Sequence, residues 1–144
     1  MYPLIVMALV LFGAVPALAG DISLPVDPGV SQDAIGETIC VEPEWSRTHR
    51  PPWRVTNAIK RRLLADAGLP PESIRDFELD HQVPIDLGGS SELANLRLQP
   101  WPEAREKDRV ETCLARSVCA GRVPLAEAQT AIWNDWRSAA RLCQ

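Results

Sequence analysis

The stretch from residue 77 to residue 98 constrains the fold most, because it holds two short segments of strand character around a glycine-rich turn. Phe77 and Leu79 alternate with polar residues, which predicts a strand over 77–84. Gly88-Gly89-Ser90-Ser91 predicts a turn or wider loop, and 95–98 predicts a return strand. A helix is predicted over 103–117, directly after these strands. The order strand, loop, strand, helix favours the α+β class.

Two further helices are predicted on either side of this segment. Thr56 can cap a helix over 57–67, with Gly68 as its stop. Pro124 begins a last helix that runs past Trp136. We therefore expect a small sheet flanked by α-helices.

The length and composition fit one globular domain after a leader and an arm. The chain has 144 residues, of which 46% are hydrophobic and 24% charged, so one modest core is possible and wholesale disorder is excluded. Residues before Trp53 are rich in proline, and Pro51-Pro52 blocks helix formation. The predicted division is a leader over 1–19, an extended proline-rich arm over 20–55 and a domain over 56–144 whose motif core is 77–117.

Residues 3–18 form an apolar run without charge. The run ends in Ala17-Leu18-Ala19, an A-x-A pattern that suits a signal peptidase. It predicts a cleaved signal peptide and a periplasmic or secreted protein, with no stable membrane span after signal removal. The start Met1-Tyr2-Pro3 lacks the usual Lys or Arg, so an uncleaved anchor is the alternative.

All four cysteines follow this leader. An even number of cysteines in an exported chain suggests two disulfides. A structural zinc site usually has C-x-x-C pairs, which this sequence lacks. Three pairings are possible and sequence does not choose among them. We favour Cys40 with Cys119 and Cys113 with Cys143, which would tie the arm and the last helix to the middle of the chain.

The charge is unevenly distributed. The net charge of −4 counts against a nucleic-acid binder, but residues 45–64 carry no acid and six basic residues: Arg47, Arg50, Arg54, Lys60, Arg61 and Arg62. Such a local patch can hold a phosphate backbone despite an acidic total. Trp45 and Trp53 lie within it, and tryptophans among basic residues can stack on bases. The alternative is a solvated helix face with two covering tryptophans.

The residues Asp80 and His81 could carry chemistry. Neighbours on a strand point to opposite faces. A carboxylate is a hard ligand for a divalent ion, and a neutral imidazole can take a proton from water near neutral pH. The alternative is a hydrogen-bonded histidine at a strand end.

A longer pattern surrounds this pair. Its members are Glu78-Leu79-Asp80-His81, Pro84, Leu87-Gly88-Gly89, Asn95-Leu96 and Lys107-Asp108. In residue types, spacing and element order this string resembles the HNH endonuclease family, whose fold is called ββα-metal, and within it a bacterial subgroup. The resemblance implies a ββα-metal centre in a disulfide-stapled α+β protein.

The resemblance also implies roles for three residues. His81 would be the general base that activates water, Asp80 would hold a divalent metal, and Asn95 would hydrogen-bond across the loop and fix how His81 points. The metal would bind the scissile phosphate and stabilise the leaving oxygen. Carboxylate ligands favour Mg²⁺ or Mn²⁺.

The chain departs from the family at the helix, where a third His or an Asn is expected as second metal ligand. Its two histidines are His49 and His81, and neither lies there. Glu103 is the candidate second ligand, with Glu106 in reserve, because Glu103 shares the helical stripe that should face the strands. The alternative is a first-turn acid paired with Lys107.

Two functions follow from these residues. The first is a metal-dependent endonuclease of low sequence specificity that cleaves DNA or RNA. Phosphate contacts would come from Arg97, Arg105 and Lys107. The alternative is a non-catalytic binding module of HNH fold in the cell envelope.

Overall fold

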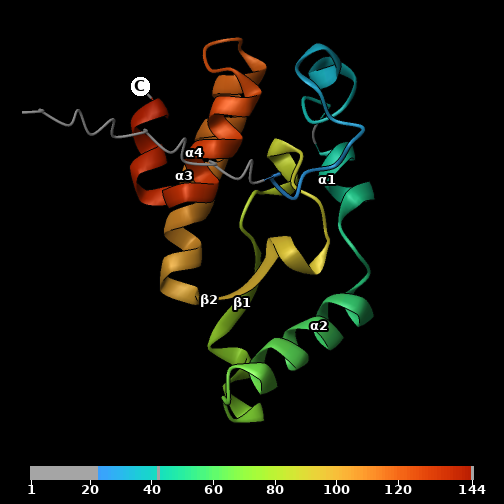
Figure 1. Cartoon of the computed structure of the whole chain (residues 1–144), viewed down its shortest axis with the longest axis vertical. Coiled ribbons are helices and arrows are strands. Elements are labelled where there is room, and N and C mark those ends of the chain that lie inside the picture. Colours follow the sequence, from blue (N-terminus) through green and yellow to red (C-terminus); the bar gives the residue numbers. More distant parts are fainter. Residues whose placement is uncertain (1–22, 42, 144) are drawn as a thin grey trace, which may run out of the picture.

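The structure is a computed structural model that describes residues 23–41 and 43–143 (Figure 1). The predicted signal peptide lies outside these residues. The α-helices are α1 (Glu44–His49), α2 (Trp53–Asp66), α3 (Trp101–Cys119) and α4 (Leu125–Ala139), and the strands are β1 (Phe77–His81) and β2 (Leu96–Pro100). Short 3-10 helices are η1 (Gln32–Glu37), η2 (Pro71–Arg75), η3 (Ile85–Leu87), η4 (Leu93–Asn95) and η5 (Ala140–Cys143). No helix among the described residues is long and apolar enough to cross a membrane.

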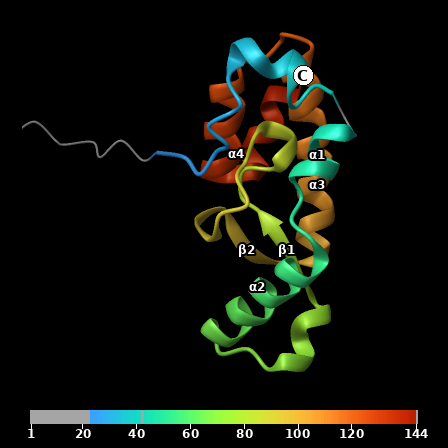
Figure 2. The same ribbon diagram turned by 90° about the vertical axis from the view of Figure 1, so that its right-hand side faces the viewer.

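The two strands form one antiparallel sheet. Asp80 pairs with Arg97 and His81 with Leu96 across the ladder. Figure 2 shows this sheet between α2 on one side and the α3–α4 pair on the other. The α+β class is confirmed in this form, a small sheet among helices.

The helix α3 contacts both the sheet and α4, and so connects the sheet to the main hydrophobic core. Pro102 lies in its first turn, as predicted, and Gly121 follows its end with a φ of 69°. The apolar face of α3 packs against α4 and against the loop after β1. The buried core so formed includes Val83, Leu87, Leu114, Val118, Leu125, Ala128, Ile132 and Trp136.

Two disulfides close the fold. Cys40 is bonded to Cys119, with Cα atoms 5.6 Å apart, and Cys113 is bonded to Cys143, with Cα atoms 5.7 Å apart. The favoured pairing is therefore confirmed. The first bond ties the N-terminal segment to the end of α3, and the second ties η5 to the middle of α3. Two disulfides agree with the expectation of an oxidising compartment.

The prediction of an extended arm over 20–55 needs correction. The segment contains η1 and α1, and α2 begins within it at Trp53. The helix α2 can begin this early because Pro52 lies just before its first residue, where the missing N–H of proline costs no hydrogen bond. Thr56 therefore lies inside α2 and its hydroxyl donates to the Trp53 carbonyl, whereas we had predicted a capping role. The predicted stop at Gly68 is confirmed by its φ of 67°.

Candidate functional site

The imidazole of His81 lies at the end of β1, where the strand enters the loop that leads to η3. Only 8% of the residue is exposed, and Nε2 lies 3.0 Å from the Ser91 hydroxyl. Burial lowers the pKa of His81 to about 4, with a smaller contribution from the positive charges of Arg50 and Lys107 and against the opposing effect of Asp80. The ring is therefore neutral at physiological pH and can accept a proton.

The side chain of Asn95 fixes the loop on which His81 stands. Its Nδ2 donates to Val83 O at 2.8 Å and to Ser90 O at 2.7 Å, and its Oδ1 accepts from Val83 N at 2.9 Å. Gly89 allows this closure, because a Cβ at that position would lie 1.8 Å from Val83 O. The hydrogen bond across the loop that we predicted for Asn95 is thus present in the structure.

The carboxylate of Asp80 lies between two cations. Lys107 Nζ is 3.0 Å from Oδ1 and Arg97 Nε is 3.1 Å from Oδ2. Asp80 is buried, and Arg97 also donates to Gln99 Oε1 at 3.1 Å. Both oxygens of the predicted metal ligand are therefore engaged by protein cations.

The ammonium of Lys107 is fully buried, with an exposed fraction of 0%. Besides Asp80 it contacts the His81 carbonyl at 2.8 Å and the Glu111 carboxylate one turn further along α3. An ammonium has three donors, and all three are used. Burial raises the pKa of Glu111 to about 7, against the opposing effect of Lys107. The expectation that Lys107 contacts a phosphate needs correction, because a ligand at the surface cannot reach it.

The predicted second ligand has another partner. Glu103 Oε2 accepts from Arg137 Nη2 of α4 at 2.9 Å, and its side chain is 45% exposed. It lines a hollow beside α4, and Asp80 lines a different one. The structure thus brings Lys107 to Asp80 from α3 in place of Glu103. Glu106 and Arg105 are exposed on the same helix.

A metal centre does not fit the side chains at these positions. Within residues 23–41 and 43–143, no group of three or more His, Cys, Asp or Glu side chains could hold a metal ion. Asp80 is bonded to two cations and Glu103 to a third. The donor set that the resemblance implies is thus not presented for a divalent ion.

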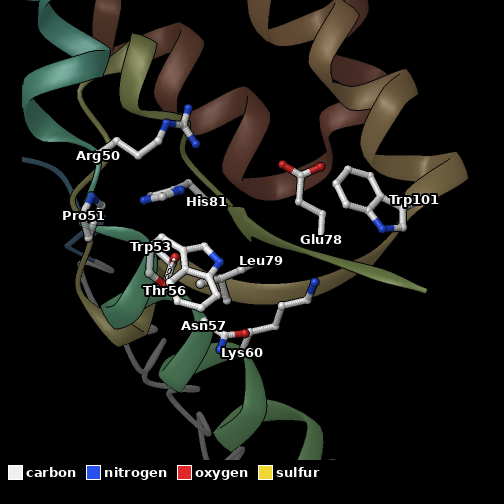
Figure 3. Close-up of a pocket in the computed structure, with 10 residues that line it drawn as sticks. All are labelled: Arg50, Pro51, Trp53, Thr56, Asn57, Lys60, Glu78, Leu79, His81 and Trp101. Carbon is white, nitrogen blue, oxygen red and sulfur yellow. Dashed lines mark hydrogen bonds between the residues drawn. The ribbon is translucent and has the colours of Figure 1, made fainter. Parts of the chain in front are cut away.

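A cleft of about 360 Å³ opens over β1 (Figure 3). His81 is one of its lining residues, together with Arg50, Pro51, Trp53, Thr56, Asn57, Lys60, Glu78, Leu79 and Trp101. Trp53 is 73% exposed and Trp101 is 38% exposed, which is unusual for such large apolar side chains. Figure 3 shows the two indoles at opposite sides of the cleft, with Glu78 and Lys60 between them.

The charges in the cleft are partly compensated. Lys60 Nζ lies 6.0 Å from the centroid of the Trp101 ring, at the limit of a cation–π contact. Burial raises the pKa of Glu78, and the charges of Asp108 and Asp80 raise it further. Burial lowers the pKa of Lys60, while Glu78 opposes that shift. The cleft thus combines two exposed aromatic faces with two cations and a neutral imidazole.

The two tryptophans of the predicted basic patch, Trp45 and Trp53, have different roles in the structure, and only Trp53 lines the cleft. Trp45 stacks on His49 with ring centroids 3.5 Å apart and donates to Ile85 O at 3.3 Å, so it covers the loop after β1 as the alternative proposed. Of the six basic residues in the predicted patch, Arg50 and Lys60 line the cleft. Sequence reasoning did not single out Trp101, although its position directly after β2 was a usable signal.

Comparison with protein-family models, with curated proteins and with solved structures gave no match, so the geometry of the site carries the functional argument.

Proposed function

We propose that this protein is a nuclease of low sequence preference that hydrolyses phosphodiester bonds with His81 as general base. The observation that carries the proposal is the shared cleft, in which a neutral histidine lies with two cations and two exposed indoles. Cations bind phosphates and indoles stack on bases of any sequence. The order β1, loop, β2, α3 and the loop-crossing Asn95 support assignment to the ββα-metal type.

His81 would act through the nitrogen that faces away from Ser91. With Nε2–H donating to the Ser91 hydroxyl, Nδ1 keeps its lone pair for the proton of the attacking water. Arg50 would bind the phosphate next to this water. Burial is the largest cause of the low pKa of His81 in the free protein, and the charge of Arg50 adds to it. The bound phosphate would offset the charge of Arg50, so the imidazole becomes a stronger base when substrate is present.

Substrate would lie along the cleft between the two indoles. A cleft that offers ring faces suits unstacked bases, and each base stacked on an aromatic side chain contributes about 1–3 kcal/mol. We therefore expect single-stranded DNA or RNA to bind more tightly than a duplex. The predicted requirement for Mg²⁺ or Mn²⁺ stays a prediction, and the mechanism proposed for His81 and Arg50 contains no step through a metal.

The test is a cleavage assay with the oxidised mature protein on plasmid, single-stranded DNA and RNA, each with EDTA, Mg²⁺ or Mn²⁺. His81→Ala should abolish cleavage. Gln82→Ala is the matched control, because Gln82 is the next residue and its side chain makes one long bond, of 3.4 Å, to Ala94 O. Equal activity in His81→Ala and wild type would refute the role of His81.

The pairing of Asp80 supports a second candidate, a non-catalytic module that binds nucleic acid in the same cleft. The ion pairs of Asp80 with Lys107 and Arg97 join β1 to α3 and β2, and this structural role does not require that Asp80 take part in catalysis. Fluorescence anisotropy with a labelled single strand separates the two functions. Binding that depends on Trp53, without cleavage under any of the conditions above, would favour the module.

A further inference from the structure

Three oxygens converge on one point behind His81. They are Asp80 Oδ1 at 3.0 Å, the His81 main-chain carbonyl at 2.8 Å and a carboxylate oxygen of Glu111, and the atom at that point is Lys107 Nζ. The carbonyl and one carboxylate come from β1, and the other carboxylate comes from α3. Carboxylate and carbonyl oxygens are the donors that hard divalent ions take. The cluster therefore has the ligand chemistry of a cation site, and an ammonium occupies it.

The acids of this cluster are already engaged by cations of the protein. Lys107 contacts both Asp80 and Glu111, and Arg97 holds the second oxygen of Asp80. A divalent ion at Asp80 would lie next to a fully buried ammonium. A doubly charged ion and an ammonium that lie this close repel strongly even at the effective dielectric constant of a protein interior. Binding of a metal there would require Lys107 to leave the interior.

We propose that the ammonium of Lys107 is the resident cation of this site, and that the protein holds no divalent metal at Asp80. The site is a latent metal site: removal of the ammonium leaves two carboxylates and a carbonyl facing one vacancy of cation size. This inference does not rest on the proposed hydrolysis, because its test measures metal binding and contains no catalytic readout.

The first measurement is Mn²⁺ titration of the metal-free full chain, followed by electron paramagnetic resonance, in which the free ion gives the signal. Wild type and Asp80→Asn should take up the same small amount of Mn²⁺. Asp33→Asn is the control for loose attraction to the acidic surface, because Asp33 is exposed on η1, outside the hollow that Asp80 lines. One tightly bound Mn²⁺ per wild-type chain that is lost in Asp80→Asn and retained in Asp33→Asn would overturn the proposal.

The second measurement uses Lys107→Met, with Lys60→Met as the matched loss of a lysine. Lys107→Met should have a lowered Tm, should bind one Mn²⁺ per chain, and should regain part of its Tm when Mn²⁺ is added. Wild type and Lys60→Met should show no such rise. A folded, fully oxidised Lys107→Met that binds no Mn²⁺ would contradict the latent site. If this variant does not fold, the comparison of wild type with Asp80→Asn still decides the proposal.

Discussion

Replacement of Asn95 by alanine should destabilise the protein more than most single substitutions. The change removes three hydrogen bonds of 2.7–2.9 Å and leaves Val83 N, Val83 O and Ser90 O without their partner. Each bond contributes about 1 kcal/mol, and a buried group left without a partner costs about 1–3 kcal/mol. We therefore expect the free energy of unfolding to fall by about 3–4 kcal/mol, a large share of the typical 5–15 kcal/mol of a domain.

Urea unfolding of the oxidised protein, followed by tryptophan fluorescence, measures this loss. Gln82→Ala is the control, and it should change the free energy of unfolding by less than about 0.5 kcal/mol because its side chain is partly exposed. Asn95→Asp tests the donors separately, since it keeps the acceptor for Val83 N and loses both donated bonds. A loss below about 1 kcal/mol in Asn95→Ala would refute the claim that this side chain holds the loop.

Three further predictions concern pH, the cleft and a disulfide. Between pH 6.5 and pH 4 the unfolded chain binds a proton at His81 that the folded chain does not, so the free energy of unfolding decreases as the pH falls. Relative to His81→Gln, wild type should lose about 3 kcal/mol of this free energy between pH 7 and pH 4, measured by urea unfolding. A difference between the two proteins that does not change with pH would contradict burial of the ring. Trp53→Ala should weaken the binding of a single strand by about tenfold, measured by fluorescence anisotropy. Leu93→Ala removes an exposed apolar side chain outside the cleft and should leave this affinity unchanged. Equal affinities of Trp53→Ala and wild type would exclude stacking on Trp53. Replacing Cys40 and Cys119 together by serine should lower the free energy of unfolding by about 4 kcal/mol, since the bond closes a loop of 79 residues, and an unchanged urea midpoint would refute this.

The sheet and α3 could be predicted because their signals are local. Alternation at Phe77 and Leu79, the glycine turn and Pro102 each act within a few residues, so the order and type of these elements agree with the prediction. Their bounds differ: β1 ends at His81 and not at 84, β2 begins at Leu96 and runs to Pro100, and α3 spans Trp101–Cys119. The loop-crossing bond of Asn95 could be predicted through the resemblance. The start of α2 could not, because Pro51-Pro52 can either block a helix or precede one, and contacts with the rest of the chain decide between these outcomes.

The partner of Asp80 was missed for a different reason. Lys107 shares a helical stripe with Val110 and Leu114, and this stripe faces the hairpin, so the pattern already pointed Lys107 inward. The strong tendency of lysine to be exposed argued for a surface role. Two acids, Asp80 from a distant strand and Glu111 one turn away, reverse that tendency by supplying the acceptors that a buried ammonium needs. Only the tertiary structure brings the first of them within reach.

The bond between Cys40 and Cys119 also affects what a proteolytic cut does to the protein. The segment between these two cysteines contains α2, both strands, Lys107 and the residues that line the cleft. A single peptide-bond cut anywhere between them, for example in the turn at Gly68 that separates α2 from η2, leaves the two pieces covalently joined. A nicked molecule would therefore keep every residue of the site on one covalent framework.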